Sequence, residues 1–378
     1  MWAMKAFVLW GAGSLGAVQV GMLRSLTAHR VRAELVVGAS VGALNAAYHA
    51  ARPSPAGVEE LATLWLSVGR HDVYPLRPAE MLHALAENLP WHPLRGALRA
   101  LGALNYAFPV NQLTLEAAAA GRRNYLFDND RLADFLARAL PVDRLEDSRI
   151  RLAVLTADAR NGDPMLLSRG PAVPALLASA AIPGIYPTVE VDGRILMDGG
   201  VAHHTALDAA VECGADEVYL LGPGFCCRQP APPPTVIAMM LHAYNLLAEQ
   251  RMAASIARVE HRIRLHLLPP VCPVDVLPID FRETAELITR AAEATSRWLD
   301  GDHEPPTGTA LLDDRHTTAY GVGPTLSQIK RPRRGGIPAG GVRDASRSRY
   351  RAHRRTVRHS VLAAPVGEAP WACRNANE

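Results

Sequence analysis

A serine at the centre of a Gly-x-Ser-x-Gly pentapeptide is the first candidate for chemistry in this chain. Ser40 lies in Gly38-Ala39-Ser40-Val41-Gly42, directly after the apolar run 35–37. A strand that turns sharply into a helix at such a pentapeptide exposes the serine oxygen as a nucleophile, next to helix N–H groups that stabilise negative charge. The same residues also fit a serine that only caps the helix, so Ser40 alone leaves both interpretations open.

A glycine-rich loop follows the predicted strand 5–9 and is the second candidate. Its residues, Gly11-Ala12-Gly13-Ser14-Leu15-Gly16, match the Gly-x-Gly-x-x-Gly fingerprint of dinucleotide-binding folds. That fingerprint requires an acidic residue at the end of the next strand, but Ser40 follows that strand and Glu34 lies at its start. An oxyanion hole fits better than NAD(P) binding, because backbone N–H groups beside a nucleophile stabilise the oxyanion of acyl transfer.

A carboxylate is the third candidate. Asp198-Gly199-Gly200 follows a predicted hairpin whose turn is Asp192-Gly193. An aspartate held beside a serine hydroxyl can act as its base, which would give a Ser40–Asp198 dyad. Two interpretations compete with the dyad: Asp198 closes an ordinary turn, or a histidine just downstream, His203 or His204, is the base.

The hydrophobic pattern predicts the elements that must position these residues. Pro53, Pro55 and Gly57 mark a loop, and residues 58–125 are expected to be mostly helical. The alternation of strands and helices predicts an α/β fold with a central, mostly parallel sheet. Strands are predicted over 5–9, 35–37, 150–155, 164–167, 189–191, 194–197, 217–221 and 263–268, and helices over 15–27, 41–51, 128–140, 175–181, 205–213, 235–261 and 282–299.

Composition narrows the class of protein. The chain has 378 residues, of which 49% are hydrophobic, enough for a large buried core. Its five cysteines form no Cys-x-x-Cys motif, so we expect free thiols in a cytoplasmic protein, without a disulfide framework or a metal site. Polar residues interrupt every apolar run before it reaches 18 residues, which predicts contact with a membrane surface at most.

The excess of positive charge lies at the end of the chain. Residues 325–378 are rich in Arg, Gly and Pro and show no apolar periodicity, which predicts a disordered basic tail. Binding of nucleic acid or anionic lipid is the functional alternative for this tail. Tyr350 is the only Phe, Trp or Tyr among the arginines of 331–358, too few for a row of stacked bases, so we expect no nucleic-acid partner.

A fourth segment lies between the serine motif and the aspartate motif: Ala178-Ser179-Ala180-Ala181-Ile182-Pro183-Gly184-Ile185-Tyr186-Pro187. The glycine-rich loop, the serine motif, this segment and the aspartate motif, in that order, resemble the patatin-like phospholipase family. The resemblance implies a three-layer α/β/α fold, with Ser40 as nucleophile, Asp198 as its partner and the loop 11–16 as oxyanion hole. It also implies a carboxylic ester hydrolase of the phospholipase A or lysophospholipase kind, acting on lipid acyl esters without a metal or other cofactor.

The resemblance also organises the chain. We expect one acyl hydrolase domain over 1–310, in which 58–125 form a helical cap-like insertion, followed by the basic tail. The apolar residues of 58–125 would either cover the acyl chain or meet a membrane surface, or they would simply be core or oligomer contacts. The family loop usually reads Gly-Gly-Gly-x-Arg/Lys-Gly, so Ala12 and Leu15 depart from it, and Leu15 removes a positive charge. This departure motivates a second hypothesis, a weakly active or inactive protein of the same fold that binds a lipid or a partner. The oligomeric state does not follow from the sequence.

Overall fold

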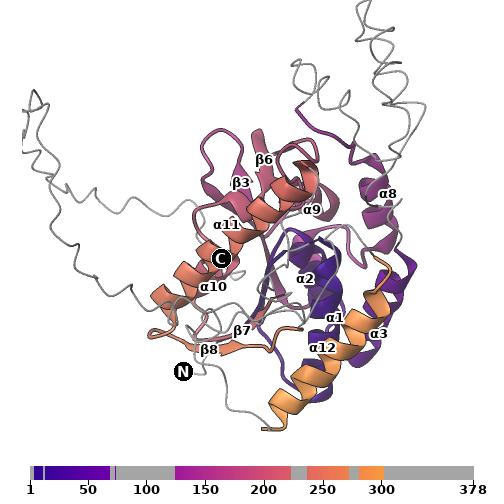
Figure 1. The fold of residues 1–378 in the computed structure, drawn as a ribbon, viewed down its shortest axis with the longest axis vertical. Coiled ribbons are helices and arrows are strands. Elements are labelled where there is room, and N and C mark those ends of the chain that lie inside the picture. Colours follow the sequence, from indigo (N-terminus) through magenta and orange to yellow (C-terminus); the bar gives the residue numbers. More distant parts are fainter. Residues whose placement is uncertain are drawn as a thin grey trace, which may run out of the picture.

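An eight-stranded sheet runs through the part of the chain that the computed structural model describes, namely residues 4–11, 13–68, 73, 124–222, 236–271 and 281–301 (Figure 1). The strand order is β5-β6-β3-β2-β1-β7-β8, and β4 pairs with β3 outside this path. The strands are β1 (Lys5–Leu9), β2 (Leu35–Ala39), β3 (Arg151–Asp158), β4 (Pro164–Leu167), β5 (Val189–Val191), β6 (Arg194–Asp198), β7 (Glu217–Leu221) and β8 (Arg264–Leu267).

The centre of the sheet is parallel. β1 lies between β2 and β7, and β3 and β8 continue the parallel arrangement on either side. Antiparallel strands β4, β5 and β6 extend it beyond β3. From β1 the chain continues to β2 on one side of β1, and it later adds β7 on the other side. The carboxyl end of β1 is therefore a topological switch point, where α/β sheets commonly bind ligands.

Helices cover both faces of the sheet. Successive strand residues point to opposite faces, and in β1 the residues on both faces are apolar and must be buried. Phe7 and Leu9 of β1 belong to one hydrophobic cluster, whereas Ala6 and Val8 belong to a second cluster, packed by α10 and α11. Figure 1 shows α10 and α11 apart from the group formed by α1, α2, α3 and α12. The helices are α1 (Gly16–Ala28), α2 (Val41–Ala51), α3 (Pro55–Ser67), α8 (Asp130–Ala139), α9 (Ala172–Ser179), α10 (Ala206–Glu212), α11 (Val236–Val259) and α12 (Thr284–Leu299).

These layers confirm the predicted three-layer α/β/α fold with a mostly parallel sheet. The predicted tail, 325–378, and residues 74–123 of the predicted cap lie outside the described residues. Within the described ranges, no helix is both long enough and apolar enough to cross a bilayer.

Two predictions made from the sequence are wrong. The predicted loop at Pro53–Gly57 instead contains the start of α3, because Pro55 suits the first helical turn and Ser54 Oγ accepts the Gly57 N–H at 3.1 Å. Cys213 is disulfide-bonded, not a free thiol. An odd cysteine count without Cys-x-x-Cys argues against a disulfide framework, but it does not exclude a single bond between distant cysteines.

A buried polar network holds the glycine-rich loop against three helices. The Gln19 amide donates to the carbonyl of Trp10 at the end of β1. The Asn45 amide donates to the Gly16 carbonyl at 3.0 Å and to Gln19 Oε1 at 2.8 Å, and its oxygen accepts the Trp65 indole N–H at 2.7 Å. Because these side chains are buried, each bond replaces one that water would otherwise make.

We expect Asn45→Ala to lower the free energy of unfolding by about 2–4 kcal/mol, since it leaves Gln19 and Trp65 with buried, unpaired polar groups. Urea denaturation measures the change. Leu66→Ala is the control, because Leu66 is 57% exposed on α3 and its loss should cost no more than about 0.5 kcal/mol. Equal stability of the two variants would contradict the role given to the network.

Candidate active site

Ser40 stands at the sharp turn between β2 and α2. Its backbone angles, φ 55° and ψ −134°, are rare for a residue with a side chain and cost on the order of 1–3 kcal/mol. Its hydroxyl makes no capping bond to α2, so the structure gives no support to the helix-cap interpretation. A Cβ at Gly42 would clash with the Leu9 carbonyl, so this glycine lets α2 start against the end of β1.

Ser179, the last residue of α9, supports the strained turn. Its hydroxyl accepts the Ser40 N–H at 2.9 Å and donates to the Leu155 carbonyl at 2.7 Å. Ser179 has no exposed surface. Two residues later, the Ala181 carbonyl accepts the Asp198 N–H at 3.0 Å. The segment at the end of α9 thus contacts both Ser40 and Asp198, which gives a physical role to part of the motif at 178–187.

The sheet register brings Asp198 level with Ser40. Ala39 of β2 pairs with Leu155 of β3, and the next residue of β3, Thr156, pairs with Asp198 of β6. Ser40 and Asp198 therefore flank β3 at the same height, although they are far apart in the sequence. Both residues line one cavity.

Asp198 is fully buried, and its two carboxylate oxygens have different surroundings. Oδ1 accepts the Gly200 N–H at 2.7 Å and the Tyr244 hydroxyl at 3.0 Å, whereas Oδ2 has no hydrogen-bond partner among the described residues. Burial raises the pKa of Asp198 to about 6, although the nearby Ser40 hydroxyl, the two donors Gly200 and Tyr244, and the positive charge of Arg251 all act to lower it. Asp198 closes a turn through Oδ1, and Oδ2 remains available for a proton.

The glycine-rich loop lies against the Ser40 side chain. A Cβ at Gly11 would clash with Ser40 Cβ and lie 2.9 Å from its Oγ, so only glycine allows this close approach. Gly13 has φ 58° and begins a short 3-10 turn, Gly13–Leu15. Leu15 packs against the larger hydrophobic cluster, Ser14 is buried, and Ala12 lies outside the described residues.

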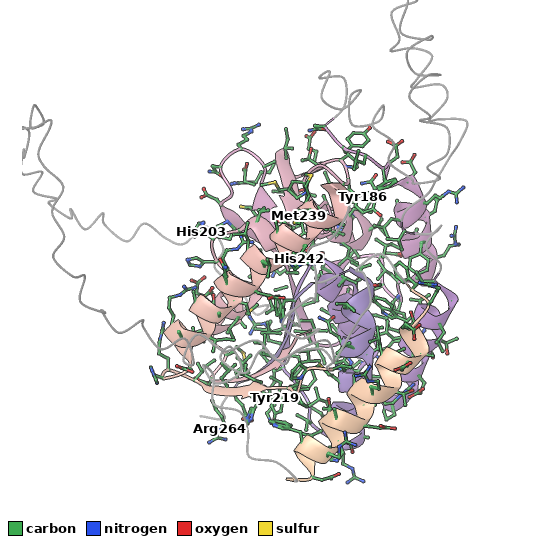
Figure 2. All side chains as sticks on the ribbon, in the orientation of Figure 1. Tyr186, His203, Tyr219, Met239, His242 and Arg264 are labelled. Carbon is green, nitrogen blue, oxygen red and sulfur yellow. The ribbon has the colours of Figure 1, made fainter. Side chains whose placement is uncertain are left out.

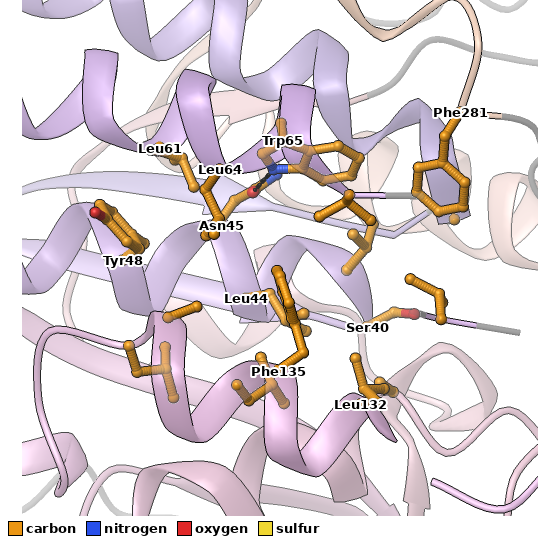
Figure 3. Close-up of a pocket in the computed structure, with 18 of the residues that line it drawn as sticks. Ser40, Leu44, Asn45, Tyr48, Leu61, Leu64, Trp65, Leu132, Phe135 and Phe281 are labelled. Carbon is orange, nitrogen blue, oxygen red and sulfur yellow. Dashed lines mark hydrogen bonds between the residues drawn. The ribbon is translucent and has the colours of Figure 1, made fainter. Parts of the chain in front are cut away.

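Two cavities meet at Ser40, and they differ in character. The apolar cavity extends along α2 between α3 and α8; Figure 3 shows Ser40, Leu44 and Tyr48 following one another along α2, with Phe135 of α8 facing them. The second cavity shares Gly13 and Ser40 with the first; we call it the polar cavity because charged and polar side chains lie among the apolar residues that form most of its wall. It is lined by the glycine loop and by Asp198, His204, Tyr244, Asn245 and Arg251, among others.

The two candidate histidine bases are placed differently. His204 lines the polar cavity, and its Nδ1 lies 3.1 Å from a Glu212 carboxylate oxygen. His203 is exposed and is not among the residues that line either cavity. Among the residues described, no group of three or more His, Cys, Asp or Glu side chains could hold a metal ion.

Residues of α11 are the part of the site that sequence reasoning missed. Tyr244 donates to Asp198, and the Arg251 guanidinium donates to the carbonyls of Gly200 and Ala202, the second at 3.0 Å. The only signal in the sequence is their spacing of seven residues, which places them on one face of a helix. That spacing is also typical of an ordinary packed helix.

Comparison with known proteins identifies the family. A model of the family described as patatin-like phospholipase matches residues 7–211, more than half of the chain. This chain belongs to the patatin-like phospholipase family. The family consists of lipid hydrolases, and the matched segment includes Ser40, Asp198 and the loop 11–16.

Solved structures of bacterial proteins are also similar to this chain. VipD from Legionella pneumophila is 14% identical, with a TM-score of 0.38, over 79% of this chain and 67% of the VipD chain. ExoU in its heterodimeric complex with SpcU, from the type III secretion system of Pseudomonas aeruginosa, is 14% identical with a TM-score of 0.31. The match covers 79% of this chain but only 52% of that one, about half its length.

We expect Ser179→Ala to lower the free energy of unfolding by about 2–4 kcal/mol, because it leaves Ser40 N–H and the Leu155 carbonyl unpaired at a strained turn. Ser25→Ala is a matched control, since Ser25 is also buried but makes one bond, to the Ala292 carbonyl at 2.6 Å, far along α1. Its loss should cost about 1 kcal/mol. Chemical denaturation of both variants tests the difference, and equal losses would argue against a special role for Ser179.

Proposed function

We propose that this protein is a serine lipid acyl hydrolase in which Ser40 is the nucleophile and Asp198 its base. One observation carries the proposal: Ser40 lies where the polar cavity that holds a buried carboxylate meets an apolar cavity suited to an acyl chain. Membership of a family of lipid hydrolases agrees with it. The specific reaction would be hydrolysis of a carboxylic ester, as in phospholipase A or lysophospholipase activity.

Acylation of the serine comes first. Asp198 Oδ2 takes the proton of the Ser40 hydroxyl as Ser40 Oγ attacks the ester carbonyl carbon. The carbonyl oxygen becomes an oxyanion, for which the N–H groups of the loop 11–16 are the proposed donors. When the tetrahedral intermediate collapses, the bond to the alcohol oxygen breaks, and that oxygen takes the proton back from Asp198. An acyl-serine and a free alcohol result.

Deacylation repeats these steps with water. Asp198 takes a proton from a water molecule, whose oxygen attacks the acyl carbon, and the same N–H groups hold the second oxyanion. The bond between the acyl carbon and Ser40 Oγ then breaks, and Oγ recovers the proton from Asp198. Every proton moves between groups of the chain, the ester and water, so this mechanism requires no metal or other cofactor.

The two cavities suggest how a lipid ester would lie. Its acyl chain would occupy the apolar cavity along α2, and its alcohol portion would lie in the polar cavity. Three apolar side chains of α11 are exposed, Met239 by 38%, Met240 by 55% and Leu247 by 58%, and they support contact with a lipid surface. The disulfide at Cys213 removes the thiol argument for a cytoplasmic location.

A second function has one observation in its favour. Leu15 occupies the loop position that is usually basic in the family and packs on the core, so this loop brings no positive charge to the site. A weakly active or inactive protein that binds a lipid or a partner through the same cavities would follow. An NAD(P) site is not proposed, because β2 ends at Ala39 and Ser40 follows where that site would need an acid.

Replacing either member of the dyad should abolish ester hydrolysis. We expect Ser40→Ala and Asp198→Asn each to lower kcat/KM for a p-nitrophenyl ester by about 10³-fold or more. Asp216→Asn is the control, since Asp216 is exposed at the start of β7 and should keep full activity. Circular dichroism checks that each variant is folded.

The same assay distinguishes the alternatives. An inert but folded wild-type protein, with Ser40 unreactive towards a fluorophosphonate, would favour the binding function. Activity that survives in Asp198→Asn but is lost in His204→Gln would make His204 the base and would contradict the dyad.

The pH dependence of the reaction should report on Asp198. Only the carboxylate accepts a proton, and the pKa of Asp198 is raised to about 6, so kcat/KM should be level above that pH. Below it, the rate should fall about tenfold per pH unit as the base becomes protonated. Rates measured from pH 4.5 to 8 with wild type and His204→Gln test this, and an acid limb that disappears in His204→Gln would contradict it.

A further inference from the structure

We propose that Tyr244 of α11 is a third member of this site, a positioning residue that holds the Asp198 carboxylate so that only Oδ2 is left for the Ser40 hydroxyl. The proposal rests on the proposed function and extends it to a helix beyond the segment matched by the family model, which ends at residue 211.

Contacts around Oδ1 are the first support. Tyr244 Oη donates to Asp198 Oδ1 at 3.0 Å, and the Gly200 N–H donates to the same oxygen at 2.7 Å. Two donors on one oxygen fix the rotation of the carboxylate. Oδ2 is then directed elsewhere, and it has no hydrogen-bond partner among the described residues. A buried carboxylate oxygen without a partner lowers stability, and such an unpaired polar group is typical of a site that binds or reacts.

The second glycine of the Asp-Gly-Gly motif fits Tyr244 closely. A Cβ at Gly200 would clash with Tyr244 Oη and would lie 2.9 Å from Asp198 Oδ1. Any other residue at 200 would push the tyrosine hydroxyl away from the carboxylate. The motif therefore makes room for the tyrosine as well as for the turn.

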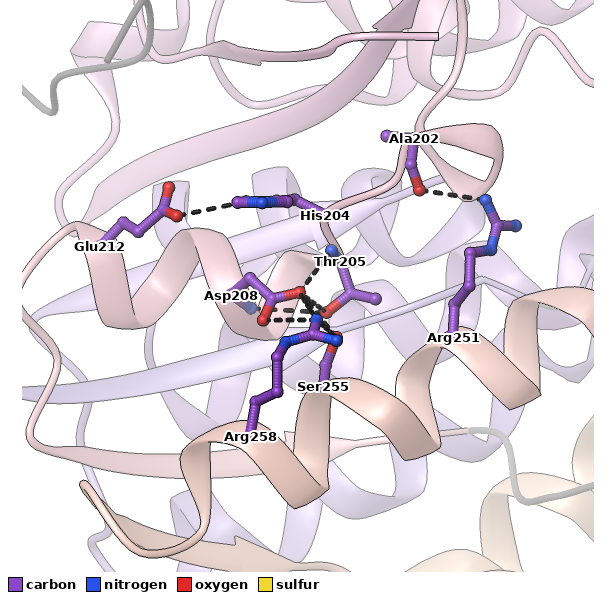
Figure 4. Close-up of polar contacts among 8 residues, drawn as sticks. All are labelled: Ala202, His204, Thr205, Asp208, Glu212, Arg251, Ser255 and Arg258. Atoms are coloured by element: carbon purple, nitrogen blue, oxygen red, sulfur yellow. Dashed lines mark hydrogen bonds and ion pairs between the residues drawn. The ribbon is translucent and has the colours of Figure 1, made fainter. Parts of the chain in front are cut away.

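Two anchors fix the position of α11, as Figure 4 shows. Arg258 and Ser255 bind the Asp208 carboxylate of α10, Arg258 at 3.0 Å and Ser255 at 2.6 Å. Nearer the site, Arg251 donates to the Ala202 carbonyl, which Figure 4 also shows, and to the Gly200 carbonyl. Tyr244 lies on the same face of the helix, seven residues before Arg251, so the anchors hold its hydroxyl in place.

The polar and charged groups around Asp198 determine how loss of the Tyr244 hydroxyl would change the pKa of Asp198. Facing the carboxylate or its cavity are Ser40 from the β2–α2 turn, Tyr244 and Arg251 from α11, and His204 from the loop before α10. Burial holds the pKa of Tyr244 well above 10, so its hydroxyl stays a neutral donor. A donor to the ionised carboxylate lowers the pKa of Asp198, and its removal raises that pKa.

Tyr244→Phe tests the proposal in the full-length protein. We expect the acid limb of kcat/KM for the p-nitrophenyl ester to move to higher pH, so that the variant loses about tenfold more activity at pH 6 than at pH 8. A merely structural role for Tyr244 would lower activity equally at all pH values. An acid limb that coincides with that of wild type would overturn the proposal.

Tyr219→Phe is the matched control. Tyr219 is also largely buried and lies beside a carboxylate, Glu217, but it stands on β7 and lines neither cavity. Figure 2 shows it in the lower part of the molecule, away from Met239 and His242 of α11. This variant should keep the wild-type pH profile, which separates the effect at Asp198 from the general effect of losing a buried hydroxyl.

Thermal stability provides a readout that does not depend on hydrolysis. The pKa of Asp198 is raised from 3.8 to about 6 in the folded protein, so the folded state binds this proton more tightly than the unfolded state does. The free energy of unfolding should therefore fall as the pH rises between these two values and be level above them. In Tyr244→Phe the folded-state pKa is higher still, so the fall should continue beyond pH 6. The difference in Tm between wild type and variant should therefore widen from pH 5 to pH 8.

The two readouts separate the proposals. A wild type that does not hydrolyse esters would count against the proposed function, and the Tm curves would still decide the role of Tyr244. Parallel curves for wild type and Tyr244→Phe would overturn that role whether or not the protein is an esterase.

Discussion

The buried carboxylate of Asp198 is the constraint on which the rest of the site depends. A carboxylate without exposed surface is stable only if hydrogen bonds and opposite charge offset its loss of water. Gly200, Tyr244 and Arg251 supply these contacts from a tight turn and from a separate helix. The compensation is partial, since burial still raises the pKa of Asp198 to about 6, which would suit a base that works near neutral pH.

The strained backbone of Ser40 is the second feature of the site that lowers the stability of the fold. Its positive φ is kept because β2, α2 and the end of α9 fix the turn from three sides. Ser179 is central here, since one hydroxyl satisfies both the turn and β3. The polar network around Asn45 holds the neighbouring loop in a similar way. Strain and burial thus occur together at the place where the two cavities meet.

The sequence predicts the elements with local signatures well and the tertiary contacts poorly. Ser40, the loop 11–16 and Asp198 stand out because glycines mark where the backbone must turn or approach closely, and the strand pattern predicts the sheet. Tyr244 and Arg251 have no such mark, since a tyrosine and an arginine on a long helix are ordinary residues there. Pro55 and Cys213 were mispredicted because proline suits both loops and helix starts, and a disulfide depends on distances that spacing does not reveal.

The register of β2, β3 and β6 has a consequence for how this protein can vary. The separation of Ser40 and Asp198 is set by hydrogen bonds across β3, not by the length of chain between them. Most residues that line the apolar cavity lie on α2, α3 and α8, so substitutions there would reshape the cavity and leave the register unchanged. Under the proposed function, selectivity for the acyl chain and the chemistry of bond cleavage would therefore be carried by separable parts of one chain, so that substitutions could alter the first without disturbing the second.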